Sequence, residues 1–440
     1  MMSDFFLSSL LLILLASHFS PGSSEATTTP LRNLTSKLLT SEQIACNFIK
    51  HPTLSVCRTI RRVTNATGEI PSEIGLLTKL THVSLKANGV LPTTIGKLTK
   101  LKHLDCGASV FEGTVPSEIG RLTLLTHLTL RQFVDGKKLP ASIGKLTQLQ
   151  YLDLSNNFFF NSKLPSLQIA KLKQLRHLNL RGSIFPENNV TAYVGKLTRL
   201  TSLDLRLCAG LSGTIPKAIF KLRNLKYLGL GGTRGSGFEG TLPNAIGNLR
   251  SLENFDISYS AVTGTIPSSI GFLTNLTSLN LGTNYFTAGS VPSFLGNLKR
   301  LSHLGLRSTG RTGQIPSVMA KLKKLTYLEL SNNDLIGTLP TELTLLTRLE
   351  GLYLNHNSLT GTIPSTYGKL TRLTTLYLNA NELRGTIPSA IGKLTKLYDS
   401  YFERNQLEGE IPSSLCANSD HISVDCEEVV CPCTPACECW

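Results

Sequence analysis

The residues best suited to chemistry in this sequence recur at regular intervals instead of gathering in one motif. Histidine stands at the same place in three successive intervals, as His82, His103 and His127. Imidazole is a common zinc ligand, and neighbouring strands about 5 Å apart would set the three rings side by side. The sequence shows no fixed hydrogen-bonding partners for these rings, and a repeated surface position accounts for them without a metal. We therefore expect no metal site and no cofactor.

Carboxylates occupy the next outward position in alternate intervals. They are Asp105, Asp153, Asp204 and Asp256. On an open sheet such residues stand roughly 10 Å apart, which exceeds the usual separation of the two acids in a glycosidase. The sequence also carries no Ser-His-Asp arrangement, phosphate-binding loop or dinucleotide fingerprint. These patterns predict that the protein is not an enzyme.

Aromatic residues then take the carboxylate position in three consecutive intervals. These are Tyr353, Tyr377 and Tyr401, with Tyr398 and His356 close to them in the sequence. Tyrosine combines a rigid apolar ring with a hydroxyl group and is enriched at interfaces. We predict that these five residues bind the ligand. The alternative is that the rings stack on one another and cover the last coils.

Side chains recur in this way when the chain itself repeats, and the repeat is plain between residues 339 and 410. Three units of 24 residues follow one another there without a gap, and the leucine pattern LxxLxL places alternate side chains on one face of a short strand. Stacked strands would form a parallel sheet over a continuous leucine core, which is typical of a solenoid. The same register gives fourteen units, which begin at positions 70, 91, 115, 139, 164, 190, 215, 242, 266, 291, 315, 339, 363 and 387.

In each unit a fixed set of residues after the strand forms the turn. Asparagine follows the last strand leucine by three positions in seven units: Asn88, Asn157, Asn284, Asn333, Asn357, Asn381 and Asn405. A buried amide needs hydrogen-bond partners, which backbone groups of the loop and the neighbouring coil can supply. A glycine in the loop allows positive φ, as at Gly337, and the proline after it fixes an extended exit.

These residues resemble the plant-type leucine-rich repeat, whose consensus reads roughly LxxLxLxxNxLxGxIPxxIGxL, over about residues 64–415. The resemblance implies an α/β repeat fold: a right-handed solenoid of about fourteen repeats of roughly 24 residues, with a parallel concave sheet and disulfide-capped ends. Members of this class include receptor ectodomains and secreted inhibitors of cell-wall polygalacturonases. The resemblance therefore implies recognition of a protein, a peptide or a cell-wall glycan through the concave face, as an inhibitor or a co-receptor in defence or signalling.

The ends of the chain differ from the repeats. Residues 5–16 form an apolar run that is too short to cross a bilayer and fits the core of a signal peptide. We divide the chain into a signal peptide (1–26), a linker and cap (27–69), the solenoid (70–410) and a cysteine-rich cap and tail (411–440). No later segment is apolar enough to span a membrane, so we expect a secreted protein of the extracellular space or cell wall, without a transmembrane anchor.

Cysteines accompany both predicted caps, and secretion favours their oxidation. We expect Cys46 to pair with Cys57 and Cys416 with Cys426. The tail adds four more cysteines, which suggest two disulfides or a soft-metal cluster and whose connectivity the sequence leaves open: Cys431, Cys433, Cys437 and Cys439. In a secreted protein the four N-x-Thr sequons are expected glycosylation sites, at Asn33, Asn65, Asn189 and Asn275.

The net charge of +15 raises the question of an acidic partner. Seventeen of the 44 Lys and Arg residues lie in two repeat columns on the connection opposite the sheet, such as Lys369 and Arg372. Periodic charges of this kind favour a solvated repeat surface, and we expect no nucleic-acid partner. The alternative function that these columns suggest is a structural wall or matrix component that binds acidic polysaccharide.

Overall fold

The computed structural model describes residues 62–107, 110–111, 113–132, 138–158, 165–184, 193–233, 237–433 and 437–439. Of the two compact units of the chain, Met1–Ile49 and Lys50–Trp440, all of these residues belong to the second. Several sequence predictions therefore lie outside the described residues: the signal peptide, most of the N-terminal cap with Cys46 and Cys57, and the sequons at Asn33 and Asn189.

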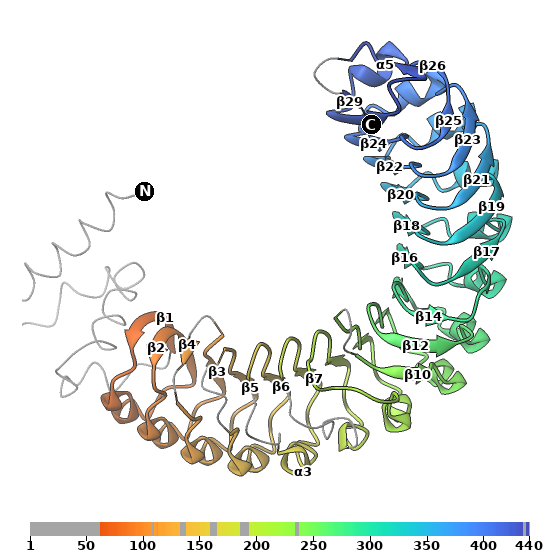
Figure 1. Ribbon diagram of the computed structural model, residues 1–440. Helices are drawn as coiled ribbons and strands as arrows, with labels where there is room; N and C mark the ends of the chain where they lie inside the picture. The colour runs from red at the N-terminus through yellow and green to blue at the C-terminus, as the bar shows by residue number, and fades with distance from the viewer. Residues whose placement is uncertain are drawn as a thin grey trace, which may run out of the picture. The chain divides into compact units, whose positions relative to one another are not determined.

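A parallel sheet of 18 strands dominates the second unit and lines the inner side of its curve (Figure 1). Fourteen of its strands belong to the fourteen predicted repeats: β2 His82–Gly89, β3 His103–Asp105, β5 His127–Thr129, β6 Tyr151–Asp153, β7 His177–Asn179, β8 Ser202–Asp204, β9 Tyr227–Gly229, β11 Asn254–Asp256, β13 Ser278–Asn280, β16 His303–Gly305, β18 Tyr327–Glu329, β20 Gly351–Tyr353, β22 Thr375–Tyr377 and β24 Asp399–Tyr401. Four further strands extend it: β1 Arg62–Glu69 before the repeats, β27 His421–Val424 and β29 Cys437–Cys439 after them, and β4 Val110–Phe111 beside the end of β2. The solenoid predicted from the leucine pattern is confirmed.

The leucines of the repeat form the core, as predicted. Leu349, Leu352 and Leu354 are all fully buried, and so are their counterparts in the neighbouring repeats. Each such side chain contributes about 1.5–3 kcal/mol of burial free energy, so a stack of repeats is stable although one repeat is not.

Short helices form the outer side of the curve in Figure 1. Each 3-10 helix begins directly after a proline in extended conformation, which suits proline because the first N–H of a helix has no intrahelical partner. These helices are η2 Ser72–Leu76, η3 Thr93–Lys97, η4 Ser117–Arg121, η5 Ala141–Lys145, η6 Lys217–Lys221, η7 Asn244–Asn248, η8 Ser268–Phe272, η9 Ser293–Asn297, η10 Ser317–Lys321, η11 Thr341–Leu345, η12 Ser365–Lys369 and η13 Ser389–Lys393. The described residues also contain two short α-helices, α3 Ser166–Ile169 and α5 Ser413–Cys416.

The predicted asparagine turn is also confirmed. The Nδ2 of Asn381 donates to the carbonyl oxygens of Leu354, 27 residues earlier, at 3.0 Å and of Leu378 at 2.9 Å. Its Oδ1 accepts from the N–H of Leu359 at 3.0 Å. The amide therefore ties one coil to the previous one. Cys208 replaces asparagine in one repeat and its thiol donates to the carbonyl of Leu180 at 3.0 Å.

Smaller parallel sheets flank the repeats on the side that follows the asparagine turn. A three-stranded sheet contains β10 Glu239–Thr241, β12 Ala261–Gly264 and β14 Tyr285–Phe286. A six-stranded sheet contains β15 Gly289–Ser290, β17 Arg311–Gly313, β19 Asp334–Thr338, β21 Ser358–Gly361, β23 Glu382–Gly385 and β25 Gln406–Leu407. A two-stranded sheet pairs β26 Gly409–Glu410 with β28 Val429–Val430.

The break between the first two flanking sheets contains a buried arginine. Arg311 is only 3% exposed, and its guanidinium donates to the carbonyl oxygens of Thr287 at 2.6 Å, Ser290 at 3.3 Å and Thr309 at 2.8 Å. The guanidinium thus supplies donors to backbone carbonyls at the point where one flanking sheet ends and the next begins.

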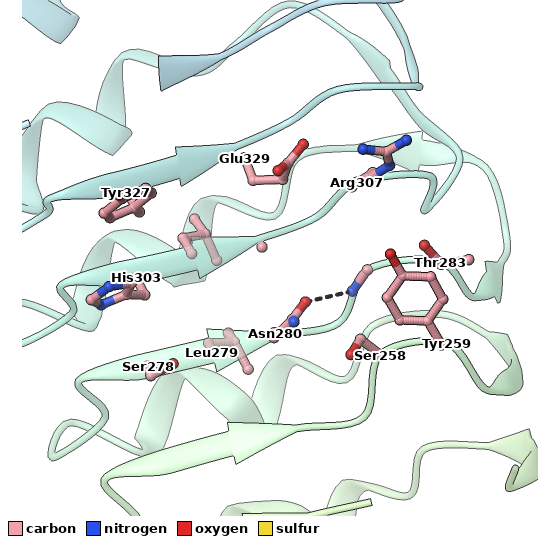
Figure 2. A pocket seen from close by; sticks show the side chains of 13 residues that line it. Ser258, Tyr259, Ser278, Leu279, Asn280, Thr283, His303, Arg307, Tyr327 and Glu329 are labelled. Carbon is pink, nitrogen blue, oxygen red and sulfur yellow. Dashed lines mark hydrogen bonds between the residues drawn. The ribbon is translucent and has the colours of Figure 1, made fainter. Parts of the chain in front are cut away.

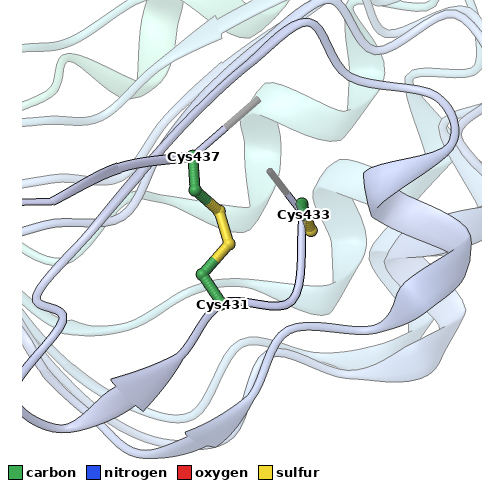
Figure 3. Close-up of side chains that lie close together, drawn as sticks. All are labelled: Cys431, Cys433 and Cys437. Carbon is green, nitrogen blue, oxygen red and sulfur yellow. A yellow bond between two sulfur atoms is a disulfide. The ribbon is translucent and has the colours of Figure 1, made fainter. Parts of the chain in front are cut away.

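Three disulfides close the C-terminal end and correct the expected pairing of Cys416 with Cys426. Cys416 pairs with Cys433, and Cys426 with Cys439. The reason is that the tail adds strand β29 beside β27, with Val424 opposite Cys439, so that the cysteine after β27 meets the end of β29. Cys431 pairs with Cys437, as Figure 3 shows, while the nearby Cys433 is bonded elsewhere. The four tail cysteines are thus used in disulfides, which answers the alternative of a soft-metal cluster.

The two remaining described cysteines, Cys106 and Cys208, are buried free thiols. Burial raises the pKa of both, for Cys208 to about 12. A thiol with such a pKa is a poor nucleophile at neutral pH. Among the described residues, no helix combines the length and the apolar character that crossing a membrane requires.

Candidate functional site: the concave face

The alternation of side chains along the strands creates the candidate site. In β20, Leu352 points into the core, so that Gly351 and Tyr353 face the other way. The parallel register sets equivalent residues directly side by side, for example Tyr353 beside Tyr377 and Tyr377 beside Tyr401. We call the outward side of this sheet the concave face. Its side chains form columns that run from repeat to repeat.

The histidine column is a stack of rings. The rings of His82 and His103 have centroids 4.3 Å apart and those of His103 and His127 4.2 Å, with interplanar angles of 11° and 19°. The Nδ1 of His82 and that of His127 lie 2.9 Å from the hydroxyls of Thr81 and Thr126. Rings that lie parallel direct their nitrogen lone pairs along similar directions instead of toward one shared point, so this geometry does not suit a tetrahedral zinc ion.

Burial and mutual repulsion keep these imidazoles neutral. Burial is the main cause that lowers the pKa of His103 to about 4, and the nearby His127, His82, Arg62 and Lys102 lower it further. The pKa values of His82 and His127 are lowered as well, again mainly by burial. The column therefore offers uncharged, stacked rings near neutral pH.

Three of the four aspartates in the carboxylate column are engaged by arginine. Asp153 is fully buried, and Arg131 from the preceding repeat donates to its Oδ2 through Nε at 2.9 Å and Nη2 at 2.6 Å. The N–H of Ser155 donates to the other carboxylate oxygen at 2.9 Å. The side-chain hydrogen bond to Asp153 raises the pKa of Arg131. Sequence reasoning missed this pair, because Arg131 stands in a different column from Asp153.

A second network of this kind lies three strands further on. The guanidinium of Arg206 contacts Asp204 at 2.8 Å and, more weakly, Asp256 at 3.4 Å. The hydroxyl of Tyr227 lies 3.3 Å from Asp204, and its ring lies beneath Arg206. Three of the four aspartates that the sequence set apart as possible acids, Asp153, Asp204 and Asp256, are thus engaged by arginine. The fourth, Asp105, accepts a hydrogen bond from the N–H of Gly107 at 2.8 Å.

The three predicted tyrosines belong to a longer track of aromatic rings. Centroids are 5.0 Å apart between Tyr353 and Tyr377 and 4.4 Å between Tyr377 and Tyr401. Toward the N-terminus the track continues through Tyr327, 6.2 Å from Tyr353, to His303, 5.2 Å further. We call these five residues the ring track. His303 and Tyr327 occupy the first position of their strands and the three tyrosines the third, so the track crosses from one column to another.

Gly351 allows the track to change column. It lies directly opposite Tyr327 in the strand register. A Cβ atom at this position would come within 2.7 Å of Cε1 of Tyr327 and 2.8 Å of Cε2 of Tyr353. Because glycine leaves this space free, the two rings approach each other diagonally. In the sequence, the sign of this change of column is a glycine at a repeat position that other units fill with a side chain.

The other two predicted binding residues stand apart from the ring track. Tyr398 is 51% exposed and packs edge to face against His421, with centroids 5.3 Å apart. His356 follows the end of β20, in a left-handed backbone conformation with φ of 54° and an exposed side chain. The structure therefore brings together three of the five predicted residues.

A hollow of about 310 Å³ adjoins the N-terminal end of the ring track. Figure 2 shows His303 and Tyr327 at one side of it and Arg307, Thr283 and Tyr259 at the other. Two of the residues that line it, Gly282 and Gly305, are glycines and contribute no side chain. The exposed guanidinium of Arg307 makes no ion pair with any described residue, so it is available to a ligand.

Two further predictions concern the outer side. Asn275, the sequon with a described side chain, donates from Nδ2 to the carbonyl of Arg250 at 2.9 Å, and a glycosylated amide would keep one N–H for this bond. The basic columns lie on the outer side, as expected from the repeat. Several of their members end the 3-10 helices, among them Lys97, Arg121, Lys145, Lys321, Lys369 and Lys393.

Three protein-family models match segments of the repeat array. The family described as "Leucine-rich repeat region" matches residues 109–217 and 201–331. "Leucine Rich Repeat" matches residues 324–346, and "Leucine Rich repeats (2 copies)" matches residues 347–397. No curated protein matches the chain.

Similar solved structures include receptors of plant peptide hormones. The plant receptor RGFR1 in complex with RGF2 is 32% identical, over 83% of this chain and 58% of the receptor chain, with a TM-score of 0.69. A leucine-rich-repeat protein of Leptospira interrogans is 29% identical, over 84% and 92% of the two chains, with a TM-score of 0.68. The Arabidopsis receptor kinase HAESA in complex with the peptide hormone IDA and the co-receptor SERK1 is 26% identical, over 86% and 72%, with a TM-score of 0.61.

This chain thus spans 58% of the length of the RGFR1 chain that it matches. The family matches cover residues 109–397, and the leucine core and the asparagine turn have the repeat pattern of that family. From these observations we conclude that the chain belongs to the leucine-rich repeat family, of the plant type.

Proposed function

We propose that this protein is an extracellular recognition protein that binds a peptide, or an extended segment of a protein, along its concave face. Binding, and not catalysis, is the role that we assign to the face. In this role the protein would act as an inhibitor or a co-receptor in defence or signalling. The three disulfides favour an oxidising, extracellular location, since such bonds persist there.

The ring track is the observation that carries the proposal. It extends over five neighbouring strands without interruption and ends beside a hollow of about 310 Å³. The inward positions of these strands are fully buried, as leucine in four of them and as Ser400 in β24, so the outward positions are the ones that can be adapted to a partner. A line of rings with hydroxyl groups supplies both apolar area and hydrogen bonds along an extended ligand.

Ring geometry favours a peptide over a glycan as the ligand. Sugar rings bind flat against exposed aromatic faces, whereas Tyr377 and Tyr401 stack on each other at 4.4 Å and 19° and cover each other's faces. Edges and hydroxyl groups remain for the ligand, and these suit the N–H and C=O groups of a peptide backbone. The similar receptors RGFR1 and HAESA are described with peptide hormones, which agrees with this assignment.

Selection from a library of random dodecapeptides on the immobilised full chain tests the proposal. We expect selected peptides to bind at least tenfold more weakly after replacement of Tyr353, Tyr377 and Tyr401 by Ala, because aromatic anchors each cost about 1 kcal/mol or more when truncated. The melting temperature should barely change.

Two control variants make this result specific. Tyr285→Ala removes a tyrosine that is 74% exposed on the flanking strand β14, outside the concave face. Replacement of His82, His103 and His127 by Ala changes the far end of the concave face and should matter less. Unchanged peptide affinity after the three Tyr changes, or a large loss of stability, would return these rings to a purely structural role.

The second candidate function, a matrix component held by acidic polysaccharide, rests on the alignment of exposed Lys and Arg on the outer side. Lys97, Arg121 and Lys145 follow one another in three successive helices. Charges at this spacing would attract an anionic polymer in a salt-dependent way. Retention on polygalacturonate that disappears at 0.5 M salt and after Lys97→Gln, Arg121→Gln and Lys145→Gln would favour this function over peptide recognition.

A further inference from the structure

The concave face carries charges of opposite sign in its two halves. We count the residue before each strand and the outward residues that follow it. From β2 to β9 these positions hold seven basic residues (Lys86, Lys102, Arg131, Arg176, Arg181, Arg206, Lys226) and three acids (Asp105, Asp153, Asp204). From β11 to β27 they hold one basic residue (Arg307) and eight acids (Glu253, Asp256, Glu329, Glu350, Asp399, Glu403, Asp420, Asp425). The N-terminal half is thus +4 and the C-terminal half −7, although the whole chain is +15.

Ion pairs mark the boundary between these halves. Lys226 on the basic side contacts Glu253 on the acidic side at 2.9 Å, and Arg206 reaches Asp256 at 3.4 Å. Beyond this boundary the acids lack cationic partners. From Glu329 onward, none of the six acids of the concave face forms an ion pair with any described residue. The charge of the half-buried acids among them, Glu329, Glu350 and Asp399, is therefore available to a partner.

These unpaired acids share their strands with the ring track. Glu329 lies in β18 directly opposite Tyr353, and Asp399 begins β24, two residues before Tyr401. Burial raises the pKa of Tyr377 and Tyr401, and the negative charge of Asp399 raises both further. Carboxylates and phenolic oxygens thus form one surface that is rich in hydrogen-bond acceptors and negative charge.

Buried polar atoms at the same end also lack partners. Glu403 is 6% exposed, and its Oε2 has no hydrogen bond with a described residue. Asn379 is 8% exposed, and its Oδ1 likewise has no hydrogen bond with a described residue. Both residues stand two positions after a ring of the track, Tyr401 and Tyr377. Buried acceptors usually have a donor, and these two oxygens have none among the described residues.

We propose that the C-terminal half of the concave face, from β18 to β27, binds a cationic peptide segment that lies along the ring track, with lysine or arginine side chains directed to Glu329, Glu350 and Asp399. This inference rests on the proposed function and names the chemistry of the ligand. Ammonium and guanidinium groups are donors without acceptors, and they match a surface of carboxylate and phenolic oxygens. The basic half of the same face disfavours a second cationic segment, so the basic part of the ligand lies toward the C-terminal cap.

The test uses three fluorescent peptides of twelve residues with repeated Lys-Gly-Ser, Gln-Gly-Ser or Glu-Gly-Ser units. Fluorescence anisotropy with the full chain should give at least tenfold tighter binding of the lysine peptide than of the glutamine peptide. A protein of net charge +15 would attract the glutamate peptide by charge alone, so the predicted preference is opposite to the non-specific one.

A matched pair of variants locates the binding. A triple variant should bind the lysine peptide at least fivefold more weakly; it combines Glu329→Gln, Glu350→Gln and Asp399→Asn. The control removes three exposed acids outside the concave face instead, Asp334→Asn in β19, Glu382→Gln in β23 and Glu408→Gln after β25, and should change the affinity less than twofold. Equal losses in both variants, or no preference for lysine over glutamine, would overturn the inference.

The outcome is separable from that of the proposed function. If uncharged library peptides bind through the three tyrosines while the lysine peptide has no advantage, peptide recognition stands and the cationic ligand is wrong. If no library peptide depends on the ring track, the proposed function itself fails.

Discussion

The side chain of Asn357 and the carbonyl of Leu330, 27 residues earlier, are joined by a hydrogen bond of 3.1 Å across two coils of the solenoid. The same Nδ2 donates to Leu354 in its own coil at 3.0 Å, and the Oδ1 accepts from the N–H of Leu335 at 3.1 Å. One amide therefore makes hydrogen bonds with three backbone groups, two in the preceding coil and one in its own. The same contact recurs in other repeats, so its effect on stability is distributed along the array.

Asn357→Leu should lower the free energy of unfolding by about 1–3 kcal/mol, because the backbone groups lose their partners without gaining access to water. Denaturant unfolding of the full chain measures the effect. Asn355→Leu is the matched control, since Asn355 is an outward residue of the same repeat. A variant at 357 that unfolds with the wild-type midpoint would show that the amide is not needed.

Arg131→Met should destabilise the protein more than the double variant Arg131→Met, Asp153→Asn. The single change leaves a carboxylate with a fully buried side chain and no cation, whereas the double change removes the charge as well. Losing one partner of a fully buried pair costs about 3–5 kcal/mol, and we expect less here because the Arg131 side chain is 40% exposed. A double variant less stable than the single one would contradict this explanation.

Stability should fall on acidification because of the stacked histidines. An unfolded histidine takes up a proton near pH 6.5, whereas the folded His103 remains neutral until about pH 4. Between these values the unfolded state binds more protons, so stability is lost as pH falls through this window and is constant above it. His103→Gln should reduce the difference in unfolding free energy between pH 7.5 and pH 5, while His356→Gln should not. An NMR titration of His103 with a midpoint near 6.5 would rule out the mechanism.

Peptide mapping under non-reducing conditions should recover three cross-links at the C-terminal end: Cys416–Cys433, Cys426–Cys439 and Cys431–Cys437. Cys106 and Cys208 should react with alkylating agents only after unfolding, because both are buried free thiols. A fragment that joins Cys416 to Cys426 would restore the pairing expected from sequence. The pair of Cys46 and Cys57 stays a prediction that the same experiment tests.

The sequence by itself determined whatever recurs within one coil. The spacing of Leu349, Leu352 and Leu354 gave the strand and the core, because an inward position needs an apolar side chain in every repeat. The loop glycine was predictable for a similar reason: Gly337 has φ of 80°, a conformation that costs glycine little. Register over fourteen units followed from the same local rules.

Other turn residues were not predictable, because contacts between coils decide them. Leu207 and Tyr259 adopt φ of 56° and 54° although neither is glycine. The N–H of Leu207 donates to Gly231 of the next coil at 2.8 Å, and that of Tyr259 to Gly282 at 3.0 Å. These inter-coil bonds hold a conformation that the residue alone disfavours, so the local sequence carries no mark of it.

Only the tertiary structure decided how different columns meet. The step of the ring track from Tyr327 to Tyr353 depends on the empty place at Gly351, and the neutralisation of Asp153 depends on Arg131 reaching across to another coil. Disulfide pairing depends likewise on strand β29 lying beside β27. The repeat fixes which column each residue occupies, but these contacts run diagonally between coils. They depend on side-chain length and rotamer, which a periodic pattern does not encode.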